Sequence, residues 1–366
     1  MTSTDVRADH VGSLQRPQKL LEAAPMRSDP AARADLQALE DEAILAAIER
    51  QRAIGMSVVS DGEFRRAGFV TGFMDAVDGF VTGMPRALSW QGGTGKEALS
   101  PNANVVAAPL VARKRIAQIE VAFLKEHAGG PFKVAVPSPL MLPVGSWQPG
   151  LTDQVYPRRE DLVADAAAIL AAEAALLSTE GLPYLQVDAP HYTFWGDEKL
   201  LAGMVADGVD PDSLLRAAIA GDNSIIDAAG PDTTTGVHLC RGNSMGRWLA
   251  EGGYDNIAEA LFTGLHCDRL LLEYDDERSG GFAPLRFVPQ DKTVVLGLVS
   301  SKTPRLESRD TLLARIEEAS TVVPIERLAL SPQCGFASSG GGGPLTEDDQ
   351  WRKLELVASI AAEVWS

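Results

Sequence analysis

The chain is short of cysteine, of aromatic residues and of positive charge. Its 366 residues include 3 Cys, and 6% are Phe, Trp or Tyr. Three cysteines are too few for a disulfide scaffold, and their odd number indicates a reducing compartment, so we expect a cytoplasmic protein. Lys and Arg number 33 against 50 Asp and Glu, which gives a formal net charge of −17. Nucleic acid is not an expected partner, because binding to phosphate backbones requires basic patches.

Long apolar runs are also missing. No stretch reaches about 18 uninterrupted apolar residues, the length expected of a membrane-spanning helix. The first residues, MTSTDVRADH, contain no apolar segment of the kind found in signal peptides. We therefore expect neither a membrane span nor secretion. Apolar residues still make up 45% of the chain, enough to fill the core of two average domains or of one large α/β barrel.

Strand-like runs alternate with helical patterns along the chain. Most are separated by amphipathic or Ala-rich stretches such as 37–55, 161–181 and 311–320. The runs are ADHVGSL from Ala8, SVVSDGE from Ser57, FKVAVPSP from Phe132, YLQVDAP from Tyr184, TTGVHLC from Thr234, RLLLEYD from Arg269, TVVLGLVSS from Thr293 and LALSPQC from Leu328. This order predicts a parallel sheet and one α/β domain over 1–366, closed as a (β/α)8 barrel of the TIM type. We interpret the Gly-rich segment 64–109 as an insertion after the second strand, lying over the barrel mouth.

Four residues at the ends of predicted strands form a candidate metal site. His238 and Cys240 are two positions apart, so both side chains point to the same face of a strand. Glu273 and Cys334 lie at the ends of two other runs, where such barrels place their active sites. Two thiols, an imidazole and a carboxylate favour zinc over magnesium or calcium, which prefer oxygen ligands. Cys267 precedes its strand, and we expect it to be structural.

Simpler interpretations exist for these residues. A cysteine at the end of a strand is often buried for packing alone. Asp275 shares a strand face with Glu273 and is the rival fourth ligand. Its expected role is instead to support the site through contacts with Arg278 or Arg286.

Three glycine-rich motifs suggest other functions and are set aside. Residues 92–97 are similar to a phosphate-binding loop, but Glu97 replaces the required Ser or Thr. Residues 242–246 match the nucleophile elbow of serine hydrolases, yet His266 is the one histidine that follows Ser244. The glycines at 340–343 offer backbone N–H groups that an anion could use, but we interpret them as a flexible loop.

The motifs together resemble one known family. ADHVGSL, SDGE, VDAP, HLCRGN, LEYDDERSG and SPQCGF are similar to the C-terminal catalytic barrel of cobalamin-independent methionine synthases, especially to stand-alone bacterial members. The resemblance covers nearly the whole chain. It implies that a zinc ion is held by His238, Cys240, Glu273 and Cys334. It also implies that the amino acid part of homocysteine is bound by Val11, Gly12, Ser13, Glu63 and Asp188.

The implied substrate residues have alternatives of their own. Ser13 could simply cap a turn, and Glu63 could be a rim carboxylate paired with Arg65 or Arg66. Asp188 ends the run YLQVD, and a carboxylate buried there is costly without a partner. The ammonium group of an amino acid would satisfy it.

The chemistry implied is that of a zinc-dependent S-methyltransferase acting on homocysteine or a related thiol. A thiol coordinated to zinc loses its proton at neutral pH and becomes the nucleophile. Glu273 is the ligand that the thiol is expected to displace, so it also counts among the substrate-binding residues. Positioning supplies much of the rate of such an in-line alkyl transfer, and no protein nucleophile is needed.

Departures from the family pattern concern the methyl donor. Lys302 stands where full-length members have a histidine thought to protonate the departing folate, and a lysine there needs a depressed pKa. Phe194 replaces an acid that contacts the pterin, and we expect no N-terminal barrel to grip the folate tail. His191, Tyr192 and Trp195 either line the donor pocket or belong to the core.

Several properties stay open at the level of sequence. The donor is a methylated corrinoid, a methylfolate or another small methylated compound, and a homo-oligomer is possible. Two other classes are an epoxyalkane:coenzyme M transferase-like enzyme, which needs a basic pocket for a sulfonate, and a non-catalytic thiol- or corrinoid-binding protein.

Overall fold

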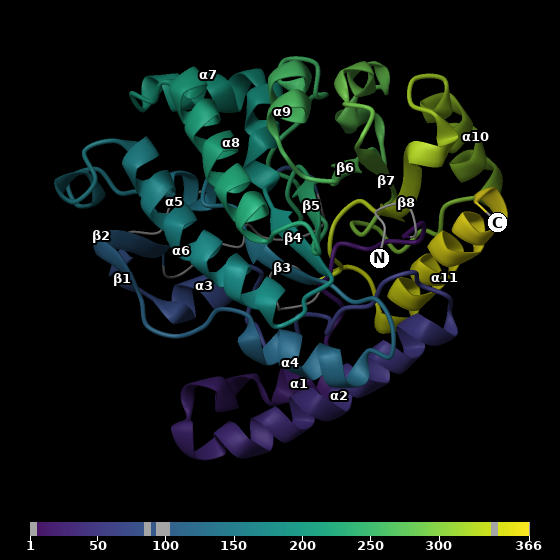
Figure 1. Ribbon diagram of the computed structural model, residues 1–366, viewed down its shortest axis with the longest axis horizontal. Coiled ribbons are helices and arrows are strands. Elements are labelled where there is room, and N and C mark those ends of the chain that lie inside the picture. Colours follow the sequence, from purple (N-terminus) through teal and green to yellow (C-terminus); the bar gives the residue numbers. More distant parts are fainter. Residues whose placement is uncertain (1–5, 84–88, 93–102, 338–342, 366) are drawn as a thin grey trace.

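A parallel sheet forms the centre of the protein, whose computed structural model describes residues 6–83, 89–92, 103–337 and 343–365. Its strands follow chain order, β3-β4-β5-β6-β7-β8. They are β3 (Val134–Pro137), β4 (Tyr184–Asp188), β5 (Thr234–Leu239), β6 (Arg269–Glu273), β7 (Thr293–Val299) and β8 (Leu328–Pro332). Because all run in one direction, their carboxyl ends meet at one edge (Figure 1).

Two further extended segments close this sheet into a barrel. Ala8 forms a parallel bridge to Leu330 in β8, and Val59 forms one to Phe132 just before β3. The two segments also join each other, since the Ser57 N–H donates to the Ala8 carbonyl at 3.1 Å. These are the first two runs predicted as strands. They occupy the predicted places but pair only through isolated bridges, because loops interrupt the ladder on either side.

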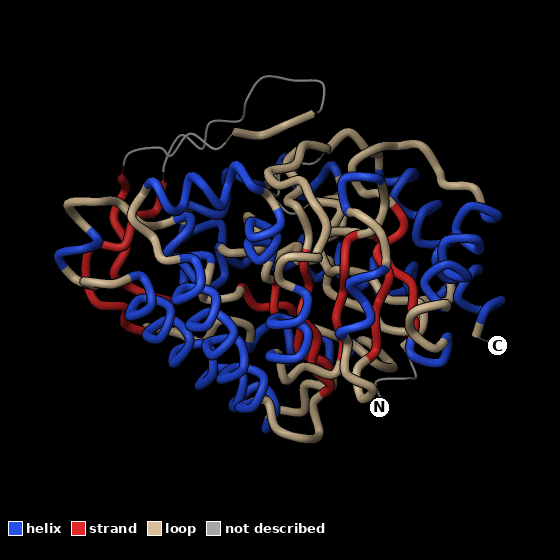
Figure 2. The backbone as a smooth tube through the Cα atoms, turned by 90° about the horizontal axis from the view of Figure 1, so that it is seen from above, coloured by secondary structure: helices blue, strands red, loops and turns tan. Residues whose placement is uncertain are grey.

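Helices surround the barrel on its outer side (Figures 1 and 2). They are α1 (Gln18–Glu22), α2 (Arg33–Ala53), α3 (Thr71–Ala76), α4 (Gln118–His127), α5 (Met141–Gly145), α6 (Arg159–Thr179), α7 (Glu198–Ala206), α8 (Pro211–Ala228), α9 (Ala258–Gly264), α10 (Arg309–Ser320) and α11 (Glu347–Val364). Several begin at a side-chain cap, such as Asp210 before α8 and the capping box of Thr346 and Asp349 before α11. The alternation of strand and helix confirms the predicted TIM-type barrel.

α6 is, among the described residues, the helix whose length and apolar composition would suffice to cross a membrane. Its buried residues include Leu162, Val163, Leu170 and Leu177. They belong to the main hydrophobic core, and α6 packs against α8. The apolar character of this helix is therefore used inside the fold.

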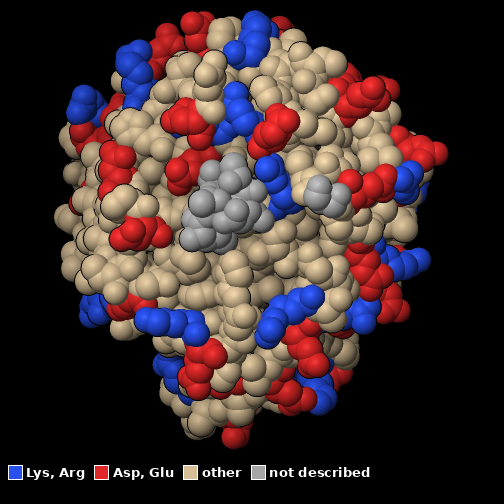
Figure 3. Space-filling model, turned by 45° about the vertical axis from the view of Figure 1, so that its right-hand side comes forward, with Lys and Arg blue, Asp and Glu red and all other residues tan. Residues whose placement is uncertain are grey.

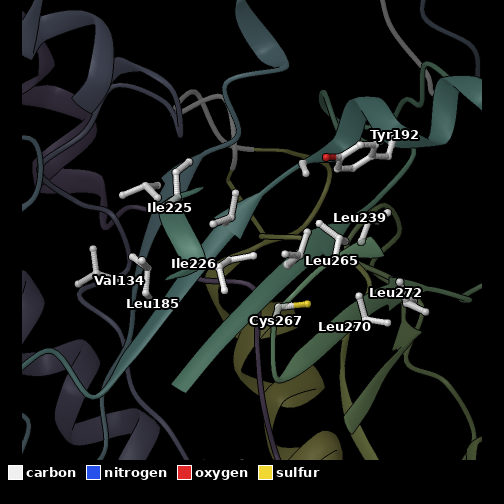
Figure 4. Packing of buried hydrophobic residues seen from close by; sticks show 14 of the residues in the cluster. Val134, Leu185, Tyr192, Ile225, Ile226, Leu239, Leu265, Cys267, Leu270 and Leu272 are labelled. Carbon is white, nitrogen blue, oxygen red and sulfur yellow. The ribbon is translucent and has the colours of Figure 1, made fainter. Parts of the chain in front are cut away.

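Alternating residues of each strand face either the helices or the barrel interior. In β4, Leu185 and Val187 join the core between sheet and helices, while Gln186 and Asp188 hydrogen-bond to each other on the opposite face. Figure 4 shows the helix-side core, where Ile225 and Ile226 of α8 lie near Leu185 and Cys267. Cys267 is 1% exposed within this cluster, as expected of a structural cysteine.

The barrel interior contains paired charges as well as apolar side chains. The Asp9 carboxylate accepts a hydrogen bond from Lys133 Nζ at 2.6 Å, and Arg269 Nη2 lies 3.4 Å away. Both cations face the ring of Tyr184. All four side chains are fully buried, so each charge relies on these partners instead of water.

The segment 64–109 contains more regular structure than predicted. It holds α3 and the antiparallel pair β1 (Val77–Gly83) and β2 (Ala103–Ala112). The weak sequence periodicity hid this hairpin, whose strands have mixed exposure, and residues 93–102 and 84–88 lie outside the described part. Between these gaps, Gln91 forms an antiparallel bridge to Trp248 in the loop after β5. Contact with that loop supports the proposal that the insertion lies over the barrel mouth.

Acidic and basic side chains are mixed on the surface. On the face shown in Figure 3, Asp and Glu are spread among Lys and Arg over the described residues. Although acidic residues outnumber basic ones in the sequence, side chains of both charges lie close together on this face.

Candidate metal centre

Three of the four predicted ligands come together at the carboxyl end of the barrel. The ligand atoms of His238, Cys240 and Cys334 all lie within 4.8 Å of one another, and the three residues are buried. The two sulfur atoms are 3.6 Å apart. His238 is in β5, Cys240 is the first residue after this strand, and Cys334 lies two residues after β8. The common direction of the strands brings these distant positions to one edge.

The geometry fits a tetrahedral zinc ion. A zinc–sulfur bond of about 2.3 Å places two tetrahedral sulfur ligands about 3.7 Å apart. The 3.6 Å between the Cys240 and Cys334 sulfurs is close to this value. The ring nitrogens of His238 are buried, and neither makes a well-formed hydrogen bond among the described residues. A buried imidazole of this kind is suited to bind a metal through one nitrogen.

The two thiols share negative charge unequally. The contact with Cys240 lowers the pKa of Cys334 well below its ordinary value, although burial opposes this, and His238 adds to the effect. The same contact, together with burial, raises the pKa of Cys240 well above its ordinary value. The protein alone therefore stabilises one thiolate. A divalent cation between the sulfurs would favour the second thiolate as well.

Glu273, the fourth predicted ligand, is held beside this group by other partners. Its Oε1 accepts a hydrogen bond from Lys302 Nζ at 3.0 Å, and its Oε2 accepts one from the Arg241 backbone N–H at 2.5 Å. Burial tends to raise the pKa of Glu273, but Lys302 and Arg241 outweigh it and hold the pKa below its ordinary value. Glu273 is thus an ionised carboxylate next to the thiols, and its ligation of zinc stays a prediction.

Lys302 lies beside the candidate metal centre, but its pKa is shifted in the direction opposite to the one that proton donation needs. Burial tends to lower the pKa of Lys302, yet Glu273 and Asp275 outweigh it, so the pKa lies above its ordinary value. Proton donation to a leaving group requires the opposite shift. The ion pair with Glu273 causes the difference, and sequence spacing alone could not reveal it.

Two buried carboxylates lie next to the metal group. Asp188 pairs in register with His238, and its Oδ1 accepts a hydrogen bond from Gln186 Nε2 at 2.7 Å. Burial raises the pKa of Asp188, and His238 opposes this. Burial, partly offset by Arg66, and the charge of Asp188 raise the pKa of Glu63 to about 7. Glu63 Oε2 is buried without a hydrogen-bond partner among the described residues, so a cationic ligand would satisfy it.

The turn at 11–13 forms the wall opposite Glu63. Gly12 has φ of 138°, and a Cβ there would approach Glu63 Oε1 to 3.0 Å, so glycine is required by both backbone and space. The Val11 carbonyl accepts from Gln186 Nε2 at 2.6 Å, and the Ser13 carbonyl accepts from the Phe336 N–H at 2.9 Å. Glu63 itself has φ of 57°, an uncommon backbone conformation for a residue other than glycine. The three predicted substrate residues of the turn therefore lie close to the two predicted carboxylates, Glu63 and Asp188.

Arg66 and Asp275 show which of the simpler interpretations hold. Arg66 Nε donates to the Glu120 carboxylate at 3.1 Å. Its backbone N–H donates to the Glu63 carbonyl at 3.0 Å, and its charge tends to lower the pKa of the Glu63 carboxyl. Asp275 is buried, with Oδ1 3.9 Å from Arg278 Nη2, and it is not a member of the metal group. Its expected contact with Arg278 is therefore present, whereas Arg286 lies over the ring of Phe287.

The aromatic residues expected near a donor belong largely to the core. Tyr192 is fully buried and donates to Asp222 at 2.6 Å, and Trp195 donates to the Pro211 carbonyl at 3.2 Å. Phe194 packs in the same cluster and faces the ring of His191. Of the two interpretations given for Tyr192 and Trp195, the structure supports the core.

The rejected motifs show no catalytic geometry in the described residues. Ser244 follows β5 at the barrel mouth, whereas His266 precedes β6 at the other end and pairs with Asp227. The two therefore cannot form a hydrolase site. Residues 93–97 and 340–342 of the other two motifs lie outside the described part of the chain.

Arg241 and Gln186 are structural parts of the site that the sequence did not reveal. Arg241 Nη2 donates to the Gly252 carbonyl at 2.6 Å, while its backbone N–H contacts Glu273. Gln186 links Lys133, which donates to it at 2.7 Å, to Asp188. The available signal in the sequence was their position: Arg241 directly follows Cys240, and Gln186 lies two residues before Asp188.

The fold and this site define a barrel enzyme with a candidate metal centre at the carboxyl ends of its strands. Residues 15–343 match the family model described as "Cobalamin-independent synthase, Catalytic domain". The chain belongs to this family of cobalamin-independent methionine synthases, which are methyltransferases. The family resemblance and fold expected from the sequence are therefore confirmed.

Individual relatives agree over almost the whole length. The uncharacterized protein YxjH of Bacillus subtilis is 37% identical over 362 residues, covering 98% of this chain and 94% of that protein. A Listeria monocytogenes structure, provisionally described as a vitamin-B12 independent methionine synthase, has a TM-score of 0.73 and 30% identity over 98% of both chains. A B12-independent methionine synthase from Shewanella sp. W3-18-1, in complex with selenomethionine, has a TM-score of 0.75 and 22% identity, covering 98% of this chain and 97% of that one.

Proposed function

We propose that this protein is a zinc-dependent S-methyltransferase that transfers a methyl group to homocysteine and forms methionine. The observation that carries the proposal is the approach of the ligand atoms of His238, Cys240 and Cys334 to within 4.8 Å of one another. Asp188 pairs in register with His238, and its charge acts in turn on the buried carboxyl of Glu63. The histidine and the two cysteines suit a metal that binds thiols, and the two carboxylates suit an ammonium group. A substrate that carries a thiol and an ammonium group on one short chain matches this arrangement.

The residues of the site have distinct tasks in this reaction. Asp188 and Glu63 hold the substrate ammonium, and Gln186 fixes the Asp188 carboxylate by its 2.7 Å hydrogen bond. Because Asp188 pairs in register with His238, a substrate held there has its side chain within reach of the two sulfurs. Zinc, held by His238, Cys240 and Cys334, would lower the pKa of the substrate thiol. Positioning of thiol and methyl donor then supplies much of the rate.

The carboxylates also favour homocysteine over a sulfonate thiol. A coenzyme M-type substrate carries a negative charge at the end opposite its thiol and needs basic partners. Asp188 and Glu63 would repel such a group, and burial makes this repulsion stronger. The epoxyalkane:coenzyme M transferase-like alternative is therefore less suited to the site.

X-ray absorption at the zinc edge, with and without homocysteine, tests the proposal. We expect the zinc-loaded protein to show two sulfur ligands and to gain a third when homocysteine is added. Methionine, whose sulfur cannot become a thiolate, serves as the matched control. An unchanged number of sulfur ligands at saturating homocysteine would contradict the proposed function.

A further inference from the structure

Lys302 and Glu273 form a fully desolvated ion pair within the metal centre. The Nζ of Lys302 lies 3.0 Å from Glu273 Oε1, and the two side chains are 3% and 0% exposed. Lys302 belongs to the loop after β7, and its backbone N–H donates to Ser300 Oγ at 3.2 Å. The ammonium group also lies near both thiols, which contribute to its raised pKa. The Lys302 ammonium group is thus paired with a buried carboxylate beside the candidate metal ligands.

Such a pair matters because Glu273 would have two competing partners. A carboxylate buried to this degree is costly if it lacks a counter-charge. Zinc can supply that charge when Glu273 is a ligand, and Lys302 supplies it in the conformation seen here. When a substrate thiolate takes the place of Glu273 on the metal, the carboxylate needs Lys302 as its partner. The Arg241 N–H, which contacts Oε2 at 2.5 Å, can guide it there but carries no full charge.

We propose that Lys302 is the counter-ion that receives the Glu273 carboxylate whenever a thiol replaces it on the metal. This inference rests on the proposed function, with Glu273 as the fourth zinc ligand, and assigns Lys302 a positioning role. In the exchange, a metal–sulfur bond to the thiolate would replace the metal–oxygen bond to Glu273. The thiol proton leaves to solvent, and Lys302 stays protonated throughout. The charge of the Lys302–Glu273 pair is then zero, so no unpaired carboxylate remains buried.

Zinc affinity tests the competition without any substrate. Lys302→Met removes the rival partner of Glu273 and keeps a long side chain. We expect it to bind zinc about tenfold or more tightly than the unaltered protein in a chelator competition, because its buried carboxylate can be satisfied only by the metal. Lys302→Arg, which keeps the charge, should stay close to the unaltered protein. Lys292→Met removes another buried lysine, one that donates to the Cys267 carbonyl, and should leave zinc affinity unchanged.

Homocysteine binding tests the exchange itself. For Lys302→Met we expect homocysteine affinity to fall by about tenfold or more, and the zinc edge to show no third sulfur ligand at a concentration that saturates the unaltered protein. The double variant Lys302→Met with Glu273→Gln should regain the third sulfur, since a neutral amide needs no counter-ion. Lys302→Arg should resemble the unaltered protein in both measurements.

The possible outcomes separate this inference from the proposed function. Equal zinc affinity in Lys302→Met and the unaltered protein, or a third sulfur ligand gained by Lys302→Met at unaltered homocysteine affinity, would overturn the role of Lys302. Failure of the unaltered protein to gain a third sulfur would instead overturn the proposed function. In that case the zinc-affinity comparison still decides whether Lys302 competes for Glu273. Thermal unfolding of each variant identifies any that lost its fold, and Lys302→Arg and the double variant then carry the comparison.

Discussion

Cys240 and Cys334 are 94 positions apart in the chain, yet their sulfurs lie 3.6 Å from each other. Cys267 is equally buried but packs among leucines and isoleucines, where burial raises the pKa of its thiol to about 12. A single thiol in an apolar cluster is a poor metal ligand, because zinc binds several donor groups together. At the scale of single residues, the surroundings of each cysteine and not its residue type separate the candidate metal site from the core.

The first prediction concerns metal content. Purified protein should carry about one zinc per chain. Cys240→Ser and Cys334→Ser should lose most of it, because each removes a thiolate ligand, while Cys267→Ser should retain it. Metal analysis of the three variants provides the measurement. The same zinc content in all three would rule out this assignment of the site.

The second prediction concerns the substrate carboxylates. Asp188→Asn removes a charge that faces the proposed ammonium and keeps the side-chain shape, so homocysteine should bind about 1–3 kcal/mol more weakly. Zinc content should stay normal, since Asp188 is not a member of the metal group. Titration calorimetry checks this, with Glu63→Gln as a parallel variant. Unchanged homocysteine affinity in both variants would remove the two carboxylates from the substrate site.

The approach of the candidate ligands was predictable where it depends on strand position. His238, Cys240 and Cys334 follow from spacing and from the ends of strands, because a parallel barrel brings those ends together. The partner of Glu273 was not predictable, since Lys302 reaches it from the loop after another strand. Such a contact depends on side-chain placement across the barrel, which sequence periodicity does not encode.

Among the secondary-structure elements, the six strands β3 to β8 are the ones that the sequence predicted best. Their runs are fully buried and rich in apolar residues, a pattern typical of a parallel sheet. The segments at Ala8 and Val59 pair too briefly to form strands, and the hairpin of β1 and β2 was missed. Both cases depend on contacts between distant residues, so local patterns could not settle them.

A buried hydrogen bond joins α8 to the short 3-10 helix at Pro190–Gly196, just after β4. Tyr192 donates to the Asp222 carboxyl at 2.6 Å, and burial raises the pKa of Asp222 from 3.8 to about 7 although this bond opposes the shift. The folded protein therefore holds a proton that the unfolded chain releases at lower pH. Stability contributed by this group is present below about pH 4 and is lost as the pH rises toward about 7.

The third prediction follows from this loss of stability as the pH rises. Asp222→Asn can still accept from Tyr192 but cannot ionise, so the variant should match the unaltered protein near pH 4 and be more stable at pH 8. The gain should be at most about 4 kcal/mol, given about 1.4 kcal/mol for each pKa unit. Urea unfolding at the two pH values measures it. Asp212→Asn, an exposed carboxylate on the same helix, is the control, and a gain of equal size at both pH values for Asp222→Asn would contradict the linkage.

At the scale of the whole molecule, one barrel supplies the metal centre and the carboxylate pair from segments at opposite ends of the sequence. The turn at 11–13 meets Glu63 and the loop after β8, and Gln186 links it to Asp188. Closure of the barrel is therefore a condition for the proposed thiol site. The structure offers less to the proposed methyl donor, because Phe194 packs in the core and Lys302 is paired with Glu273.

The last prediction is that free 5-methyltetrahydrofolate is a poor methyl donor for this protein. The departing folate needs a proton, and Lys302 holds its own firmly because the carboxylates around it outweigh the effect of burial on its pKa. Phe194 offers no acid to hold a pterin, and a misplacement of about 1 Å can reduce the rate by about a hundredfold. A methylated corrinoid needs neither group.

Methionine formation from homocysteine, measured with each donor at matched concentration, checks this expectation. Methylcobalamin should give the faster turnover, and methylfolate with one or several glutamates should give little. Equal or faster turnover with methylfolate would mean that Lys302 and Phe194 do not limit donor use. The protein would then act as a folate-dependent methionine synthase, and the ion pair of Lys302 with Glu273 would have to open during each turnover to release a proton donor.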